Sequence, residues 1–394
     1  MTEQTKPDNP ATGDKTINVD QLQPGMRLAQ DVHDQQDVLL LAAGTAVTER
    51  FLKLLRRRRV KVVRLAPKPS ERNDPPPDAR DTSDIDDSLT AALEKLYPVR
   101  HRTKGERPRL PVSDLRAEAL RGLERHAAAS KMVADTYARL HSGANPRATG
   151  IRETSGQLAS LVSLDSDLPA LLFSMQESGE EYLFDHCVNV ALISMSMAAQ
   201  IGWNRDQMTE LGMGALLQDI GMMKVPETIR LATRRLEPAE LHEIQCHPYH
   251  TLNLIERIKG LPQTAIFIAY QSHERADRSG YPRQRSGSYL HAFSKIVAIA
   301  DAYAAMTRGR PYRKALRPYE AAKNILVDGS ANKFDRQFVR AFLDSLSLFP
   351  IGSFVELNDG TAAQVIRANP GHHTEPVVEE LGRDGSQTGR IVDL

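Results

Sequence analysis

The stretch LLQDIGMMKVP, residues 216–226, decides how the fold of this chain can be interpreted. An apolar run ends there in an amide and a carboxylate, Gln218 and Asp219. Burying a carboxylate is costly unless a hydrogen bond or a cation compensates it, so Asp219 needs a partner. The stretch therefore predicts a polar site inside a helical core. It also raises the question of whether that site still binds an ion.

Four more polar side chains interrupt apolar helical sequence in the same part of the chain. They are His186 in EYLFDHCVNVALISMSMAAQI, His247 in IQCHPYHT, His273 in FIAYQSHERADRSGYP and Asp301 in IVAIADAYAAM. Imidazoles and carboxylates from separate helices suit a divalent metal ion that polarises phosphoryl oxygens. Each residue alone also has a structural explanation, since a core histidine usually bonds a backbone carbonyl. The five residues together, in this order, favour a metal site.

The composition limits the classes of protein that fit. The chain has 394 residues, enough for two or three domains. Its formal net charge is only +1, so no overall electrostatic attraction to nucleic acid or membrane is expected. Only two cysteines, Cys187 and Cys246, argue against a disulfide framework. No apolar run approaches the ~18 residues of a membrane span, and the N-terminus lacks the apolar core of a secretory signal. We therefore expect a cytoplasmic protein without a membrane or nucleic-acid polymer as partner.

The sequence pattern divides the chain into five predicted segments. They are a disordered start at 1–15, a small α+β accessory domain at 16–66, a Pro- and charge-rich linker at 67–112, a helical domain at 113–347 and a β-rich C-terminal extension at 348–394. The accessory domain is expected to contain a short helix over 51–55. The extension is expected to begin with a hairpin around NDG, residues 358–360.

The order and spacing of the polar motifs resemble the HD-GYP family, a branch of the HD metal-dependent phosphohydrolases that cleaves cyclic di-GMP. The resemblance covers residues 150–345. It rests on HCVNVA, on QDIGMMKVP where the family has HDIGK, on HPYHT, on SHERADRSGYP where the family has HHE…DGSGYP, and on IADAYAAMTRGRPYRKA. It implies a mainly α fold with an HD-type helical bundle core. It also implies a bacterial, cytoplasmic protein of cyclic di-GMP signalling.

The resemblance implies a set of metal ligands and two altered positions. The ligands fall on His186, Asp219, His247, His273 and Asp301, and the altered positions are Gln218 and Ser272. The implied metal is Fe, Mn or Zn, if the protein binds one. A glutamine carbonyl is a weaker ligand than an imidazole, and a serine hydroxyl seldom binds such ions without deprotonation. These losses predict turnover reduced by at least ~100-fold, and a mononuclear site from the five remaining residues stays open.

The resemblance also implies catalytic and nucleotide-binding residues. Asp219 is a candidate catalytic residue. The lysine that follows HDIG in the family is Met222 here, and Lys224, two residues further on, is the candidate to replace it. The implied cyclic di-GMP contacts are Gly280, Tyr281, Pro282, Arg310, Tyr312, Arg313 and Lys314. Guanidinium groups suit phosphate or the edge of guanine, although a basic loop at a helix end can also simply be solvated. Arg278 stands where the family has glycine and either narrows the pocket or adds a phosphate contact.

Three hypotheses about function follow. The leading one is a degenerate HD-GYP protein that acts as a nucleotide sensor or a protein-interaction module, with little or no hydrolysis. The alternative is an active metal-dependent phosphodiesterase with an altered metal site, which converts cyclic di-GMP to pGpG or GMP. The third is a scaffold that binds only a signalling protein partner. Enzymatic activity therefore stays open at this point.

Overall fold

The computed structural model describes residues 15–26, 31–33, 39–41, 47, 52, 62–66, 109–176, 182–309, 314–369, 372–382 and 385–394. The chain divides into two compact units, residues 1–84 and 85–394, and each is described by itself.

The N-terminal unit contains an antiparallel sheet. Its strands are β1 (Lys15–Asn18), β2 (Asp31–His33), β3 (Leu39–Leu41) and β4 (Val62–Ala66), in the order β1-β4-β2-β3. A 3-10 turn at Val19–Gln21 follows β1, and the Asn18 side chain caps it by accepting a hydrogen bond from the Asp20 amide. The strands expected in this region are therefore present. Of the helix expected over 51–55, only Leu52 lies within the described residues.

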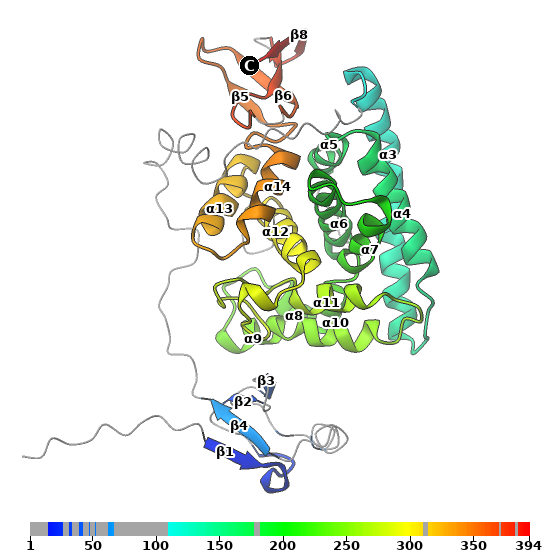
Figure 1. Cartoon of the computed structure of the whole chain (residues 1–394), viewed down its shortest axis with the longest axis vertical. Helices are drawn as coiled ribbons and strands as arrows, with labels where there is room; N and C mark the ends of the chain where they lie inside the picture. The colour runs from blue at the N-terminus through cyan, green and yellow to red at the C-terminus, as the bar shows by residue number, and fades with distance from the viewer. Residues whose placement is uncertain are drawn as a thin grey trace, which may run out of the picture. The chain divides into compact units, whose positions relative to one another are not determined.

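The larger unit is mostly helical, as predicted (Figure 1). Its helices are α3 (Val112–His141), α4 (Thr149–Leu164), α5 (Leu168–Met175), α6 (Tyr182–Gln200), α7 (Arg205–Ala215), η4 (Ile220–Lys224), α8 (Glu227–Arg230), α9 (Pro238–Gln245), α10 (His247–Ile255), α11 (Gln263–Gln271), η5 (Gly287–Tyr289), α12 (Ala292–Met306), α13 (Pro318–Ser330) and α14 (Arg336–Leu346). Among the described residues, no single helix has the length and apolar composition to cross a membrane, although the bent pair α4 and α5 meets that test together.

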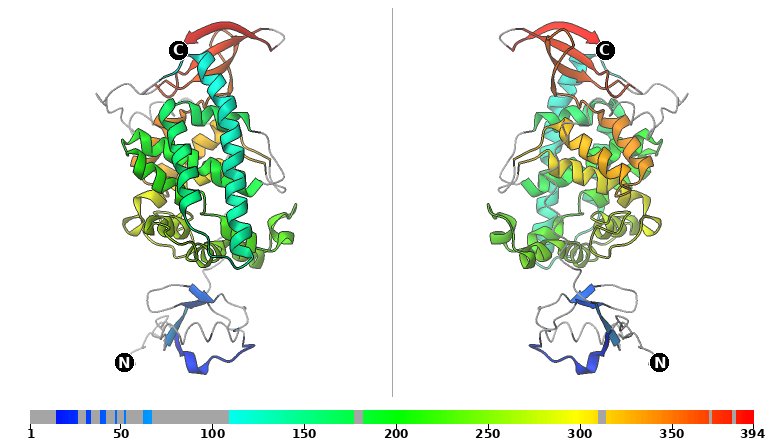
Figure 2. Two further views of the ribbon diagram at one scale, coloured as in Figure 1. Left: turned by 90° about the vertical axis from the view of Figure 1, so that its right-hand side faces the viewer. Right: turned by 90° about the vertical axis from the view of Figure 1, so that its left-hand side faces the viewer.

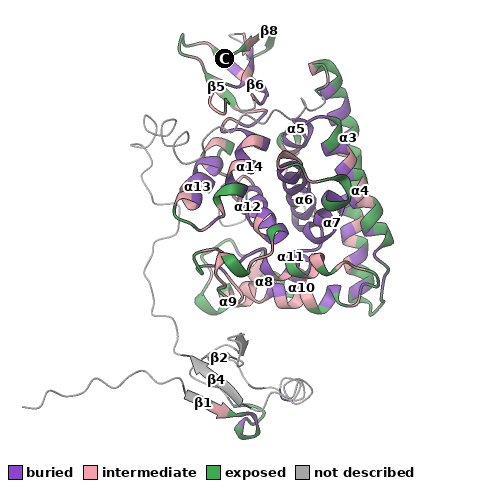
Figure 3. Ribbon diagram, viewed as in Figure 1, coloured by how far each residue is buried: buried purple, intermediate pink, exposed green. Residues whose placement is uncertain are grey.

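Helix α6 is the centre of the helical unit. It packs against α3, α4, α7, α12 and α14, and its side chains from Val188 to Ala198 are buried (Figure 3). Its sequence after His186 is apolar nearly all round, and such a helix loses no polar solvation when neighbours cover every face. The central position predicted from its sequence is confirmed.

The C-terminal residues form a second antiparallel sheet. Its strands are β5 (Phe354–Glu356), β6 (Ala362–Arg367), β7 (Val377–Leu381) and β8 (Gln387–Asp393), in sequential order. The β5–β6 hairpin turns at the predicted NDG, where Gly360 has φ 82° and Asp359 Oδ1 accepts a hydrogen bond from the Thr361 amide at 2.9 Å. The predicted β-rich extension is therefore confirmed.

This sheet is continuous with the helical core. Ala363, Val365 and Val378 belong to the same buried apolar cluster as the residues of α6 and α12. Figure 2 shows the strands beside the N-terminal end of the long helix α3. The sheet therefore packs on the helices as part of one hydrophobic core, although the sequence pattern changes between them.

A buried ion cluster joins the sheet to the helices. Arg367 Nη1 on β6 lies 3.0 and 2.9 Å from the two carboxylate oxygens of Asp165, and 3.1 Å from Asp167 Oδ2. The Leu110 amide donates to Asp165 Oδ2 at 2.7 Å, and Arg367 Nη2 donates to the Leu110 carbonyl. Burial raises the pKa of Asp167 above its ordinary value, and the nearby Arg109 opposes that shift. One guanidinium thus compensates two buried carboxylates that belong to the α4–α5 turn.

Substituting this arginine is expected to destabilise the unit strongly. Arg367→Met leaves Asp165 and Asp167 buried without their closest cation, which should lower the free energy of unfolding by about 3–5 kcal/mol. Urea denaturation can be followed by the fluorescence of Trp203, the only tryptophan, whose half-buried ring packs against Phe293 with ring centroids 4.6 Å apart.

The matched control is Arg390→Met, because Arg390 makes an exposed ion pair with Glu380 on the same sheet. Its loss should cost less than about 1 kcal/mol. Equal effects of the two substitutions would contradict a buried ionic link between sheet and helices.

Candidate metal centre

The five predicted metal ligands converge on one place. His186 comes from the first turns of α6, Asp219 precedes η4, His247 begins α10, His273 follows α11 and Asp301 lies in the middle of α12. All five side chains are buried. Their ligand atoms form two groups, Asp219 with His247 and His273, and His186 with Asp219 and Asp301, in each of which the atoms lie within 4.8 Å of one another. Asp219 belongs to both groups.

The first group is compact. Asp219 Oδ1 lies 3.1 Å from His247 Nε2 and 3.1 Å from His273 Nε2, and the two Nε2 atoms are 2.9 Å apart. One carboxylate oxygen and two imidazole nitrogens thus form a nearly equilateral triangle. This donor set fits a borderline divalent metal ion, because imidazole and carboxylate both bind such ions.

The second group is wider. His186 Nε2 lies 2.9 Å from Asp301 Oδ1 but 3.6 Å from Asp219 Oδ2. The two oxygens of Asp219 therefore face different partners, Oδ1 toward His247 and His273 and Oδ2 toward His186. A carboxylate in this position has the orientation needed to bridge two ions.

The two altered positions, Gln218 and Ser272, border these groups. Gln218 is fully buried, and its Nε2 donates to Asp301 Oδ1 at 3.3 Å. Gln218 Oε1 and the Ser272 hydroxyl are buried, and neither has a hydrogen-bond partner among the described residues. Unpartnered polar atoms are costly in a core, and these two lie beside the candidate ligands.

The turn that carries Gln218 and Asp219 is locked onto α10. The Thr251 hydroxyl donates to the Gln218 carbonyl at 2.9 Å and accepts from the Gly221 amide at 3.0 Å. A Cβ atom at Gly221 would lie 2.3 Å from both the His247 carbonyl oxygen and the Thr251 amide nitrogen. Only glycine allows this approach, and the approach holds Asp219 beside His247.

The SGYP loop supports His273 from the other side. The Tyr281 ring stacks on the His273 imidazole, with centroids 4.9 Å apart and planes at 5°, and the Tyr281 amide donates to the His273 carbonyl at 3.1 Å. A Cβ at Gly280 would lie 2.4 Å from that same carbonyl. The buried Glu274 carboxylate accepts from the Arg283 amide at 2.6 Å and fixes the end of the loop. The loop therefore holds a candidate ligand in place.

The electrostatic balance keeps the carboxylates ionised. Burial alone would raise the pKa of Asp219, but hydrogen bonds from His247 and His273 outweigh it and hold that pKa well below its ordinary value. Burial opposes ionisation of Asp301 in the same way, and the charge of His273 and the hydrogen bond from His186 lower its pKa. Two buried anions within reach of three imidazoles form a site suited to a cation.

The structure does not bring Lys224 to this cluster. Its side chain is exposed, and its Nζ lies 3.3 Å from His141 Nδ1 at the end of α3. The two-residue shift from Met222 places it on a different side of the 3-10 turn, because successive residues of such a turn point about 120° apart. A catalytic role for Lys224 therefore has no support in its position.

The predicted nucleotide contacts are described only in part. Gly280 is buried, Tyr281 and Pro282 are half-buried, and Lys314 is exposed. Arg310, Tyr312 and Arg313 lie outside the described residues. Their roles stay predictions.

Two structurally important residues were not singled out from the sequence. Thr251 anchors the 218–221 turn, and Glu274 anchors the loop after His273. Both lie inside motifs that the sequence does display, HPYHT and SHERADRSGYP. A buried hydroxyl or carboxylate next to a candidate ligand is the signal that could have identified them.

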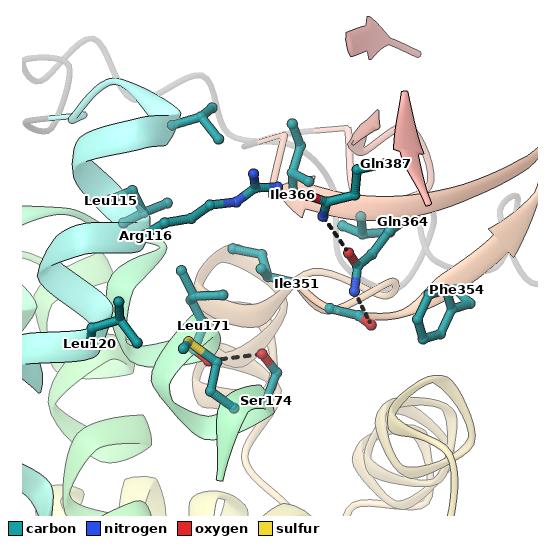
Figure 4. A pocket seen from close by; sticks show the side chains of 14 residues that line it. Leu115, Arg116, Leu120, Leu171, Ser174, Ile351, Phe354, Gln364, Ile366 and Gln387 are labelled. Atoms are coloured by element: carbon teal, nitrogen blue, oxygen red, sulfur yellow. Dashed lines mark hydrogen bonds between the residues drawn. The ribbon is translucent and has the colours of Figure 1, made fainter. Parts of the chain in front are cut away.

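A separate cleft of about 440 Å³ lies between α3, α5 and the C-terminal sheet (Figure 4). Leu115, Leu171 and Ile351 contribute to its apolar lining, and Arg116 and Gln364 add polar groups. None of the five candidate metal ligands lines this cleft. It is therefore distinct from the metal centre.

Comparisons with known proteins identify an HD domain in the helical unit. Residues 160–338 match the HD domain family. The cyclic di-GMP phosphodiesterase PA4108 of Pseudomonas aeruginosa is 27% identical over 232 residues, 55% of this chain and 55% of that protein. The cyclic di-GMP phosphodiesterase PdeB of Borreliella burgdorferi is 24% identical over 213 residues, 54% of this chain and 56% of that protein. The chain thus spans about half the length of these curated relatives.

Among solved structures, Bd1817, an HDG"Y"P protein from Bdellovibrio bacteriovorus, aligns with 84% of this chain and 99% of its own, at 16% identity and a TM-score of 0.48. The family match and the ordered motifs define the helical bundle as an HD domain. Within that class, the ordered motifs resemble those of the HD-GYP family, and the two relatives are named cyclic di-GMP phosphodiesterases.

Replacing Arg278 with glycine is expected to stabilise the protein. Arg278 is exposed and has φ 69°, in the left-handed region that costs a residue with a Cβ about 1–2 kcal/mol. Allowing for the greater chain entropy of glycine, Arg278→Gly should raise the free energy of unfolding by about 0.5–1 kcal/mol.

Arg278→Ala is the matched control, because it removes the guanidinium and keeps the Cβ. It should give no such gain in urea denaturation. A similar gain for both variants would attribute the effect to the charge and not to the backbone.

Proposed function

We propose that this HD-GYP domain binds a cyclic dinucleotide of the cyclic di-GMP class and acts as a sensor with little or no hydrolysis. The observation that carries the proposal is the Gln218 amide. It donates a hydrogen bond to Asp301 at a position where the family has a metal-binding imidazole. Beside it the SGYP loop is intact, with Tyr281 stacked on His273.

The case for the nucleotide combines relatives and retained sequence. Two relatives carry the name cyclic di-GMP phosphodiesterase. The basic segment RGRPYRK, residues 308–314, follows Asp301 as the family's ligand-binding loop does. Guanidinium groups of Arg310 and Arg313 would pair with phosphate or with the guanine edge.

The case against efficient hydrolysis rests on the altered ligands. Asp219, His247 and His273 would hold an ion, and a bound ion would polarise a phosphoryl oxygen and lower the pKa of a water molecule. Hydrolysis by two ions needs both of them positioned on the phosphate and the attacking water. The Gln218 Nε2 presents hydrogens to Asp301 and no lone pair, and the Ser272 hydroxyl is a poor ligand. The buried carboxylates of Asp219 and Asp301 would then attract a cation, but the residues around them would not position the two ions that hydrolysis needs.

The test compares nucleotide binding with turnover. Isothermal titration of the full chain with cyclic di-GMP, in the presence of Mn²⁺, should show binding in the micromolar range, with no pGpG or GMP formed over hours by chromatography. Gln218→His with Ser272→His restores two imidazoles and should raise turnover by about 100-fold or more, with a much smaller change in nucleotide affinity.

The control is Gln263→His with Ser288→His, which adds two imidazoles at exposed positions outside the cluster. This variant should leave both binding and turnover unchanged. Absence of binding heat at high micromolar nucleotide would reject the sensor. Rapid turnover by the unsubstituted chain would show instead that the altered centre is an active phosphodiesterase.

A further inference from the structure

We propose that this chain holds a single six-coordinate ion on one face made by Asp219 Oδ1, His247 Nε2 and His273 Nε2. Asp301 then acts as the carboxylate that orients His273, and Gln218 occupies the region where a second ion would be bound. The inference deepens the proposed function, because it concerns the same site. It depends on metal binding by the cluster and not on nucleotide binding.

The distances between the three donor atoms match a six-coordinate ion. They measure 2.9, 3.1 and 3.1 Å. Three donors bound to one ion at about 2.1 Å and at right angles are about 3.0 Å apart. Donors at the same bond length in a tetrahedral zinc site are about 3.4 Å apart. The spacing therefore favours a six-coordinate ion such as Mn²⁺ or Fe²⁺, held on one face by two histidines and one carboxylate.

The Nδ1 atoms of both histidines have oxygen acceptors, which leaves each Nε2 available to an ion. His247 Nδ1 lies 2.7 Å from the Ile244 carbonyl oxygen, and His273 Nδ1 lies 3.4 Å from Asp301 Oδ2. A carbonyl oxygen accepts only, so the His247 proton belongs on Nδ1, and the carboxylate favours the same tautomer for His273. When an ion is bound, both Nε2 lone pairs point into the triangle, in place of the hydrogen bonds that these atoms otherwise donate to Asp219. A carboxylate behind a metal-binding histidine is a common supporting arrangement, and Asp301 takes that place here.

The hydrogen bonds around Asp301 disfavour a second ion. Its Oδ1 accepts from His186 Nε2 at 2.9 Å and from Gln218 Nε2 at 3.3 Å. If the Gln218 amide were flipped, its carbonyl oxygen would face a carboxylate, so the donating orientation is favoured. Two N–H groups thus occupy the oxygen that a second ion would need. The 3.6 Å separation of His186 from Asp219 Oδ2 is also wider than the edges of the first triangle.

Metal stoichiometry tests the inference without any enzymatic assay. The full chain is stripped with chelator and titrated with Mn²⁺, and bound ions are counted by equilibrium dialysis with elemental analysis and by loss of the free Mn²⁺ electron paramagnetic resonance signal. We expect one ion per chain. Asp301→Asn should keep one ion and weaken its affinity about 10–100-fold, whereas His247→Ala should abolish binding. Gln218→His should admit a second ion.

Gln263→His, at an exposed position on α11, is the matched control and should still bind one ion. Trp203 fluorescence shows that each variant is folded. Two ions bound to the unsubstituted chain, or none, would overturn the inference, and so would Asp301→Asn losing metal as completely as His247→Ala. Nucleotide titration separates the two claims: failure to bind cyclic di-GMP by a chain that holds one Mn²⁺ rejects the sensor and leaves the single-ion site standing.

Discussion

The backbone of Gly221 runs directly against the first turn of α10, and the candidate metal centre depends on this contact. A Cβ atom there would lie 2.3 Å from the His247 carbonyl oxygen. The Thr251 hydroxyl closes the gap by bonding to both ends of the 218–221 turn. Asp219 and His247 come from different elements, and this approach brings their side chains into one triangle. The SGYP loop then adds His273, so backbone packing and not side-chain flexibility sets the distances between the donors.

An amide in place of an imidazole changes the chemistry of such a centre more than its shape. Gln218 is fully buried, as a ligand would be, but it offers Asp301 a hydrogen where an imidazole offers an ion a lone pair. Asp301 thereby gains one neutral donor beside the histidines that lower its pKa. The five titratable residues retain a compact arrangement, although the residues at 218 and 272 differ from the ligands that the family pattern has there.

Much of this arrangement could be predicted from sequence, for local reasons. The apolar sequence after His186 indicated a central helix, and the ordered motifs indicated that five polar residues meet. Other features depend on contacts that no local pattern reveals. The direction of Lys224 follows from a 3-10 turn, and the left-handed backbone of Arg278 follows from the loop geometry. The stacking of Tyr281 on His273 could not be inferred from spacing alone, and the contacts of Arg310, Tyr312 and Arg313 are still expectations from resemblance.

The ionic link between Arg367 and the α4–α5 turn has a consequence for how this protein can be rearranged in evolution. Arg367 lies 202 residues after Asp165 and 200 residues after Asp167 in the sequence. The arginine and the two carboxylates nevertheless depend on one another to remain buried. A recombination event that exchanged the last four strands for another module would strand two acids in the bundle's interior. Domain shuffling is therefore expected to keep the sheet together with the helices. Its boundary is expected before Arg109, whose Nη2 already donates a hydrogen bond to the Ala368 carbonyl.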